Sequence, residues 1–163
     1  MFKNIQMTVN GKAVELAVDH RETLSDTLRG LGLTSVKKGC SAGECGACTV
    51  LLDGKSVNSC IYFTLWAEGR SVLTVEGLRG DGKLHPVQQA FVDEAAIQCG
   101  FCTPGLILSA VEIVGRGEKY TRDELRNLIS GHLCRCTGYE NILNAIESVV
   151  NSGNSRNLND HAQ

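Results

Sequence analysis

Eight cysteines, divided into two sets of four with different spacings, constrain this 163-residue chain more than any other feature. The first set is Cys40-x4-Cys45-x2-Cys48-x11-Cys60, and the second is Cys99-x2-Cys102-x31-Cys134-x-Cys136. No cysteine is left over. The pattern therefore predicts two sites with four thiolates each, and the fold must hold each set in a fixed geometry.

The first set has the spacing of plant-type [2Fe–2S] sites, in which three closely spaced cysteines are followed by a distant fourth. Such a cluster is a buried anion, so dipoles must replace the water that it loses. Gly39, Gly43 and Gly46 surround the first three cysteines. Because glycine readily adopts positive φ, these residues allow backbone N–H groups to point at the sulfur atoms.

The second set combines two short segments that we expect to connect helices. Thr103-Pro104 predicts an N-cap followed by a first helical residue, directly after Cys102. The positive end of that helix favours an anionic cluster. Cys134 and Cys136 are separated by one residue, so both thiolates point the same way only where the backbone is extended, which predicts a loop rather than a helix over residues 134–136. A second [2Fe–2S] cluster between helix ends is predicted.

Disulfides and zinc are the alternatives for eight cysteines. The first eleven residues lack the long apolar core of a secretory signal, and the chain is long enough to build a hydrophobic core, which argues against disulfides. A C-x4-C-x2-C loop fits a cluster better than a zinc ribbon. Both alternatives remain open until iron, sulfide and zinc are measured.

Composition predicts a globular cytoplasmic protein. Hydrophobic residues make up 42% of the chain and charged residues 21%. The formal net charge of −2 provides no broad basic field for nucleic acid. No segment approaches the roughly 18 apolar residues of a transmembrane helix, so no membrane span is expected.

The first half of the chain predicts strands with one helix, in an α+β fold. We expect strands at 2–9, 13–18, 48–52, 57–61 and 71–75, and a helix at 23–31 with Thr23 as N-cap. Asn10-Gly11 and Asp53-Gly54 predict two-residue hairpin turns. A hairpin, a crossing helix and further strands indicate a β-grasp ferredoxin domain over residues 1–77.

The second half changes to a helical period. Residues 78–84 are rich in glycine and charge and indicate a linker. Helices are expected at 86–95, 104–114, 121–129 and 139–150, with a capping box at Thr121 and Glu124. Residues 85–150 thus predict an all-α four-helix domain that carries the second cluster. The tail, residues 151–163, is rich in Asn and Ser and is expected to be disordered.

Three motifs carry a family resemblance. They are residues 39–49 (GCSAGECGACT), 98–105 (QCGFCTPG) and 133–139 (LCRCTGY). The chain resembles the separate iron–sulfur subunit of the molybdenum hydroxylases, the xanthine dehydrogenase and aldehyde oxidase family. The resemblance covers about residues 3–150, includes all eight cysteines, and implies the same two-domain fold.

The resemblance also implies the place of each site in an electron-transfer chain. A molybdenum–pterin centre in a large subunit hydroxylates the substrate, and electrons pass through two [2Fe–2S] clusters to FAD in a medium subunit. The cluster nearer molybdenum is expected on Cys99, Cys102, Cys134 and Cys136, and the cluster nearer FAD on Cys40, Cys45, Cys48 and Cys60. Gln98 and Cys136 match positions that approach the molybdopterin-type cofactor.

The expected function is that of a non-catalytic redox subunit of an oxidoreductase, without catalytic residues of its own. An (αβγ) or (αβγ)2 assembly with the two larger subunits is implied. Residues 35–40 and 66–69 look most like xanthine dehydrogenase-type subunits, which indicates purine metabolism. Aldehydes, other heterocycles, carbon monoxide and aromatic acyl thioesters remain open as substrates, and so does the final electron acceptor.

Overall fold

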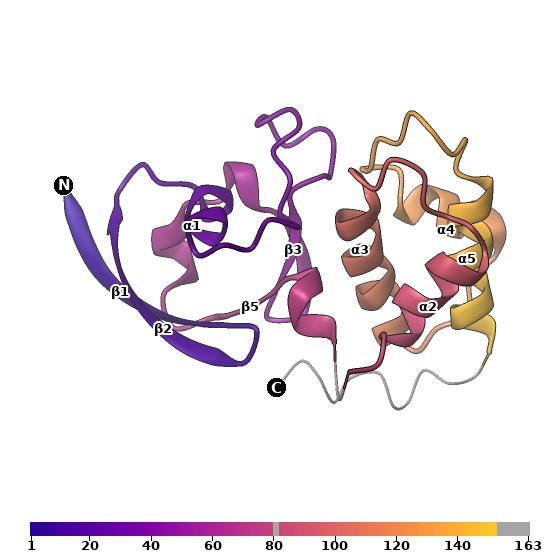
Figure 1. Cartoon of the computed structure of the whole chain (residues 1–163), viewed down its shortest axis with the longest axis horizontal. Helices are drawn as coiled ribbons and strands as arrows, with labels where there is room; N and C mark the ends of the chain where they lie inside the picture. The colour runs from indigo at the N-terminus through magenta and orange to yellow at the C-terminus, as the bar shows by residue number, and fades with distance from the viewer. Residues whose placement is uncertain (80–81, 153–163) are drawn as a thin grey trace.

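The chain forms a sheet-containing lobe and a helical lobe that lie side by side (Figure 1). This computed structural model describes residues 1–79 and 82–152. The first lobe is built from the N-terminal half and the second from the C-terminal half, so the predicted α+β class with a following helical domain is confirmed. No helix in the described ranges is long and apolar enough to cross a bilayer.

The first lobe contains a mixed five-stranded sheet. Its elements are β1 (Phe2–Val9), β2 (Lys12–Asp19), α1 (Leu24–Gly30), β3 (Thr49–Leu52), β4 (Lys55–Asn58) and β5 (Ser71–Leu73). The strand order is β2-β1-β5-β3-β4, and only the β1–β5 pair is parallel. Asn10 and Gly11 have φ of 50° and 75°, and Asp53 and Gly54 have 48° and 78°. Both predicted two-residue turns are therefore confirmed.

Two predicted strands end earlier than expected. The strand expected at 57–61 is β4, which ends at Asn58 and continues as the 3-10 turn η1 (Ser59–Ile61). The strand expected at 71–75 ends at Leu73 and leads to η3 (Val75–Leu78). Ser59 donates a hydrogen bond from Oγ to the Cys48 carbonyl at 2.6 Å. This bond stabilises the η1 turn in place of a continued strand. The turn keeps Cys60 beside Cys48.

The second lobe packs four helices around a buried apolar core. They are α2 (Pro86–Asp93), α3 (Thr103–Gly115), α4 (Arg122–Leu128) and α5 (Glu140–Asn151). The predicted capping box at Thr121 and Glu124 is confirmed, as is the Thr23 cap of α1. Thr103 is the first residue of α3 rather than its N-cap, because Cys102 takes the cap position.

The end of the chain departs slightly from the expected boundaries. Tyr139 caps α5 with a φ of 68°, so it is not the first helical residue. Asn151, assigned to the predicted tail, is the last residue of α5. Residues 153–163 of that tail, and residues 80–81 of the predicted linker, lie outside the described residues.

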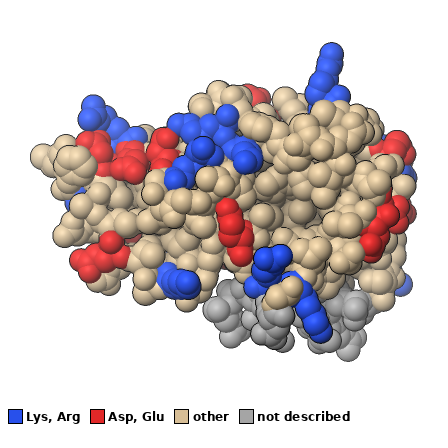
Figure 2. All heavy atoms as spheres, in the orientation of Figure 1, with Lys and Arg blue, Asp and Glu red and all other residues tan. Residues whose placement is uncertain are grey.

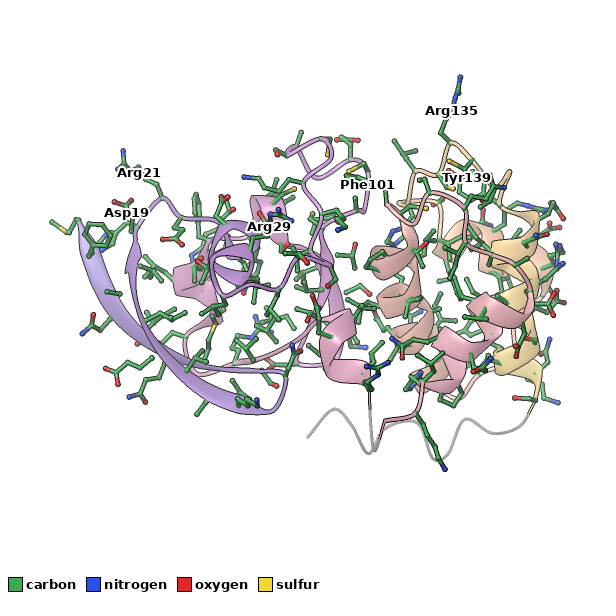
Figure 3. All side chains as sticks on the ribbon, viewed as in Figure 1. Asp19, Arg21, Arg29, Phe101, Arg135 and Tyr139 are labelled. Atoms are coloured by element: carbon green, nitrogen blue, oxygen red, sulfur yellow. The ribbon has the colours of Figure 1, made fainter. Side chains whose placement is uncertain are left out.

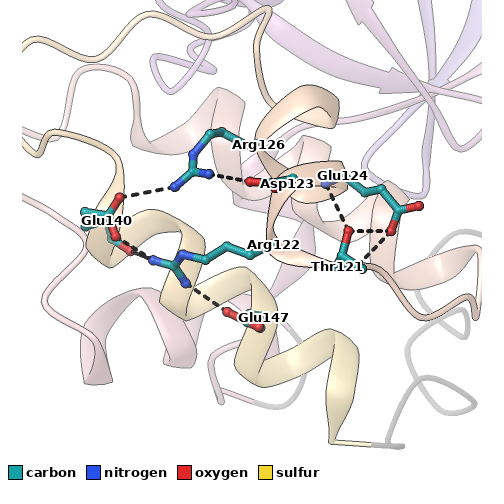
Figure 4. A network of polar contacts seen from close by, with 7 residues as sticks. All are labelled: Thr121, Arg122, Asp123, Glu124, Arg126, Glu140 and Glu147. Atoms are coloured by element: carbon teal, nitrogen blue, oxygen red, sulfur yellow. Dashed lines mark hydrogen bonds and ion pairs between the residues drawn. The ribbon is translucent and has the colours of Figure 1, made fainter.

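Charged contacts join α4 to α5 on the outer side of the helical lobe (Figure 4). Arg122 contacts Glu140 at 2.7 Å and Glu147 at 2.8 Å, and Arg126 contacts Glu140 at 3.5 Å. Within α4, Arg126 also contacts Asp123 at 2.7 Å. These pairs are largely exposed, and exposed pairs typically contribute about 0.2–1 kcal/mol each. The helical lobe therefore depends mainly on its apolar core.

Strand β3 is buried on both faces because it lies between the two lobes. Val50 and Leu52 belong to the core of the sheet lobe, whereas Leu51 belongs to the core of the helical lobe. Leu78, the first residue of the predicted linker, is only 1% exposed and packs in that same helical core. Leu78 is therefore part of the helical core, although it lies in the predicted linker. The lobes share a continuous apolar interface, which places the cysteine loops side by side.

Candidate metal centres

The loops that carry most of the cysteines lie along one edge of the molecule, the upper edge in Figure 1. They are the loop after α1, the segment before α3 and the segment before α5. All eight cysteines are free of disulfide bonds. Within the described ranges, no three His, Cys, Asp or Glu side chains converge on a single metal position.

The first cysteine set is arranged as two thiol pairs. Cys40 contacts Cys45, and Cys48 contacts Cys60. Cys48 and Cys60 are buried, whereas Cys40 is exposed. Burial raises the pKa of the Cys48 thiol to about 11. Metal binding requires the thiolate, so iron must offset this desolvation at the inner pair.

Backbone donors surround the outer pair of this set. The N–H groups of Ala42 and Glu44 each donate to Cys40 Sγ at 3.3 Å, and Cys40 N donates to Cys45 Sγ at 3.4 Å. The bonds from Ala42 and Glu44, together with the contact between the Cys40 and Cys45 side chains, lower the pKa of Cys40 to about 6. Gly43 supports the conformation with a φ of 80°. Successive N–H groups of this kind form an anion-binding concavity.

Gly43 and Gly46 adopt the predicted positive φ, of 80° and 69°, whereas Gly39 does not and is instead favoured by close packing. A Cβ atom at Gly39 would lie 2.8 Å from Cys45 Sγ, so any other residue would push into the thiolate. At Gly43 such an atom would meet only the flexible end of Ile61, but its positive φ still favours glycine. The loop therefore wraps the sulfur atoms with backbone alone.

The second set is also arranged as two pairs, built from segments far apart in sequence. Cys102 contacts Cys134, and Cys99 contacts Cys136. Burial raises the pKa of Cys102 to about 12, while Cys99 and Cys136 are exposed. Cys102 caps α3, so the positive end of that helix faces the site. Cys134 and Cys136 lie outside any helix, as expected.

Each set therefore fits one [2Fe–2S] cluster. Such a cluster takes four thiolates, two on each iron, and each set offers two pairs. A zinc site would instead gather all four thiolates of a set around one ion. The donors, the backbone N–H groups and the helix end all match an anionic cluster.

Two residues that sequence reasoning missed brace the second site. Tyr139 Oη accepts a hydrogen bond from Cys134 N at 2.8 Å and donates to the His132 carbonyl at 3.1 Å. Thr137 Oγ1 accepts a hydrogen bond from Tyr139 N at 3.2 Å and lies 3.1 Å from Cys134 Sγ. The signal was present in the Thr-Gly-Tyr run after Cys136, but no periodicity reveals these roles. Tyr139 is labelled in Figure 3.

The two cysteine loops touch each other through backbone atoms. Leu133 N donates to the Cys45 carbonyl at 3.0 Å, which joins a neighbour of Cys134 directly to a cysteine of the first set. Gly105 at the start of α3 lies against Gly46, and a Cβ atom at Gly105 would come within 2.3 Å of the Gly46 carbonyl oxygen. The sites are thus separated by little more than main chain.

His132 packs at this junction as a neutral residue. It is buried, and its Nε2 lies 2.7 Å from Ser109 Oγ. Its Nδ1 faces the Gly46 backbone but lacks a hydrogen bond of good geometry. Burial lowers its pKa to about 4. The His132 side chain therefore bonds Ser109 and packs at the contact between the two cysteine loops.

The residues expected to approach a partner's cofactor lie on the surface. Gln98 and Cys136 are both exposed. Arg135, between the two cysteines of that loop, points away from the molecule in Figure 3. Phe101 and Leu133, beside the second site, are 46% and 60% exposed. Contact of Gln98 and Cys136 with a pterin stays a prediction.

Comparison with known proteins matches both halves of the chain to iron–sulfur families. Residues 7–72 match the model of the 2Fe-2S iron-sulfur cluster binding domain, and residues 74–147 match that of the [2Fe-2S] binding domain. The chain is 48% identical to the xanthine dehydrogenase iron-sulfur-binding subunit of Escherichia coli O157:H7, over 87% of this chain and 91% of that protein.

Two further relatives show the same match along nearly the whole chain. Caffeine dehydrogenase subunit gamma of Pseudomonas sp. (strain CBB1) is 50% identical, over 89% of both proteins. The crystal structure of quinoline 2-oxidoreductase from Pseudomonas putida 86 contains a chain with a TM-score of 0.89 and 44% identity. That match covers 93% of this chain and 96% of the other.

Proposed function

Because this chain belongs to the iron–sulfur subunits of the molybdenum hydroxylase family, we propose that it carries electrons from a molybdenum–pterin centre to FAD. The pterin centre lies on a large partner subunit and FAD on a medium one. The proposed cluster ligands are Cys40, Cys45, Cys48 and Cys60 in one site, and Cys99, Cys102, Cys134 and Cys136 in the other. Each cluster, when bound, accepts and donates one electron at a time.

The observation that carries the proposal is the hydrogen bond between Leu133 N and the Cys45 carbonyl. Cys134 is bonded covalently to Leu133, so this single hydrogen bond connects a ligand of one site to a ligand of the other. Gly46 and Gly105 bring the same two loops into close contact. Electron tunnelling weakens steeply with distance, so a route through bonded atoms supports transfer between the sites.

The exposed cysteines supply the entry and exit of this route. Cys99 and Cys136 reach the surface together with Gln98 at the helical lobe, and we assign this end to the pterin. Cys40 reaches the surface at the sheet lobe, and we assign that end to FAD. Apart from the projecting Arg135, the upper part of the helical lobe is largely uncharged in Figure 2, which suits contact with a partner subunit.

The remaining assignments concern organisation and substrate. We propose residues 1–77 and 85–150 as the two cluster domains, in an (αβγ) or (αβγ)2 complex. A xanthine dehydrogenase-type complex is our first candidate, supported by the relative with that name. The relative named for caffeine matches equally well, so a substrate panel must contain several nitrogen heterocycles and aldehydes.

The test is purification of the chain from its native host with whatever subunits accompany it. We expect two larger partners, about four irons per copy of this chain, and two distinct [2Fe–2S] electron paramagnetic resonance (EPR) signals after reduction. Adding the correct substrate anaerobically should reduce both clusters without dithionite. A colourless protein that lacks iron and sulfide, or contains zinc instead, would overturn the proposal.

A further inference from the structure

Thr137 places a hydroxyl group next to a sulfur of the second site. Its Oγ1 lies 3.1 Å from Cys134 Sγ, within hydrogen-bond range for sulfur. Thr137 is partly buried, and it directly follows Cys136 in sequence. The hydroxyl can therefore form a hydrogen bond with a sulfur atom of the proposed cluster site instead of bonding only to water.

The direction of this hydrogen bond follows from the neighbours of Thr137. Tyr139 N donates to Thr137 Oγ1 at 3.2 Å, so the oxygen already accepts one bond. A cysteine that binds iron is a thiolate, which has no proton to donate. The Thr137 hydroxyl must then be the donor and Cys134 Sγ the acceptor.

The surrounding loop holds the hydroxyl in place. Tyr139 Oη bonds both Cys134 N and the His132 carbonyl, which closes the loop from 132 to 139 around Thr137. Tyr139 also adopts a φ of 68°, a backbone conformation that directs its N–H to Thr137. The O–H···S geometry is thus fixed by three other hydrogen bonds.

We propose that Thr137 is a positioning residue that raises the reduction potential of the second cluster by donating an O–H···S hydrogen bond to Cys134. The inference rests on the proposed function, because it requires a cluster on Cys134. Reduction adds negative charge to the cluster and its thiolates. A donor to sulfur therefore stabilises the reduced form more than the oxidised form.

The test compares two substitutions in the complete complex, by EPR-monitored redox titration. Thr137→Val keeps the size of the side chain but removes the hydroxyl, whereas Thr137→Ser keeps the hydroxyl. We expect Thr137→Val to shift the reduction equilibrium of the second cluster towards the oxidised form by up to about tenfold, or about 59 mV for one electron. Thr137→Ser should stay close to wild type, and the first cluster should not change.

The Thr137→Ser variant separates loss of the hydroxyl from a general disturbance of the loop, because it changes the same residue and keeps the O–H donor. If Thr137→Ser lowers the potential as much as Thr137→Val, or if Thr137→Val leaves it unchanged, the inference is wrong. Should Thr137→Val fail to bind the cluster, the smaller Thr137→Ala carries the same prediction. Absence of both [2Fe–2S] signals from the wild-type complex would instead refute the proposed function.

Discussion

The two candidate metal centres position their four cysteines with different parts of the polypeptide: the first uses backbone groups and the second uses side chains. The first site takes three of its cysteines from one continuous loop and surrounds Cys40 with backbone N–H donors. The second joins two inter-helix segments and depends on the side chains of Thr137 and Tyr139. A site built from backbone depends on conformation, so few side-chain substitutions alter it. A site braced by side chains can be adjusted one residue at a time.

The largest effect that distinguishes the sites is selective loss of one cluster. Cys136→Ser removes an exposed cysteine that we propose as a ligand of the second site, and we expect iron to fall from about four to about two per chain. The EPR signal of the first cluster should survive, because its four cysteines lie in the other lobe. Cys48→Ser is the matched variant and should produce the reverse pattern. Loss of both signals in either variant would contradict separate sites.

Contact between the lobes is tested by Gly105→Ala. The new methyl group would meet the Gly46 carbonyl oxygen at 2.3 Å, so α3 and the first cysteine loop must move apart. We expect a loss of about 1–3 kcal/mol in unfolding free energy and slower electron exchange between the clusters. Thermal unfolding and freeze-quench EPR measure the two effects.

Gly30→Ala is the control for that experiment. Gly30 ends α1 and has nothing within 4 Å of an added Cβ atom, so the substitution should be neutral or slightly stabilising. A Gly105→Ala variant that behaves like Gly30→Ala would show that the close approach does not matter.

A smaller effect is expected where Glu112 joins the lobes. Its carboxylate accepts from Ser56 N at 2.7 Å and contacts Arg116 at 3.0 Å. Burial opposes ionisation, but hydrogen bonds from Ser56 and Arg116 outweigh it, so its pKa lies below the ordinary 4.5. Glu112→Gln should cost about 1 kcal/mol at pH 7, because the amide keeps the Ser56 bond but loses the charge.

The pH dependence follows from the lowered pKa of Glu112. Its carboxylate contributes stability that is fully present above pH 4.5 and is lost as pH falls through the lower folded-state value. The difference between wild type and Glu112→Gln in urea unfolding should therefore shrink below pH 4.5. Glu118→Gln removes an exposed carboxylate that accepts from Tyr120 Oη, and as the control for charge removal it should cost less than Glu112→Gln at pH 7.

The smallest effect belongs to the exposed contacts of Figure 4. Arg122→Gln breaks the pairs with Glu140 and Glu147, and we expect it to lower unfolding free energy by less than about 1 kcal/mol. Both EPR signals should stay unchanged, since Arg122 contacts Glu140 and Glu147 and, within the described residues, no bond of Arg122 reaches a cysteine, Thr137 or Tyr139. A large change in the second cluster would show that α4 and α5 control the side-chain-built site more tightly than its hydrogen bonds indicate.

Sequence reasoning predicted the features that depend on local chemistry. The left-handed turns at Asn10-Gly11 and Asp53-Gly54 and the caps at Thr23 and Thr121 each follow from neighbouring residues, and the structure confirms them. The two-lobe order followed from a change of period along the chain. Short apolar alternation failed around Cys60, where the chain must turn beside Cys48 instead of continuing as a strand.

The contact between the lobes and the hydrogen bonds of Thr137 and Tyr139 at the second site could be found only from the structure. No sequence pattern reports that Leu133 meets Cys45, because the two residues lie in different lobes. The roles of Thr137 and Tyr139 depend on a left-handed backbone at Tyr139, which is uncommon for a tyrosine and has no turn signature. The proposed ligand sets follow from the spacing of the cysteines, and measuring the iron bound at each set is the decisive test.

The approach of Gly105 to Gly46 limits how this subunit can diversify. Substitutions elsewhere can change charge, substrate-side contacts or affinity for a neighbour without altering the gap between the redox centres. At the glycine pair, even a methyl group acts as a spacer. The distance between the two centres is thus set by direct contact between backbone atoms. Changes in side-chain size during evolution can lengthen this distance but cannot shorten it.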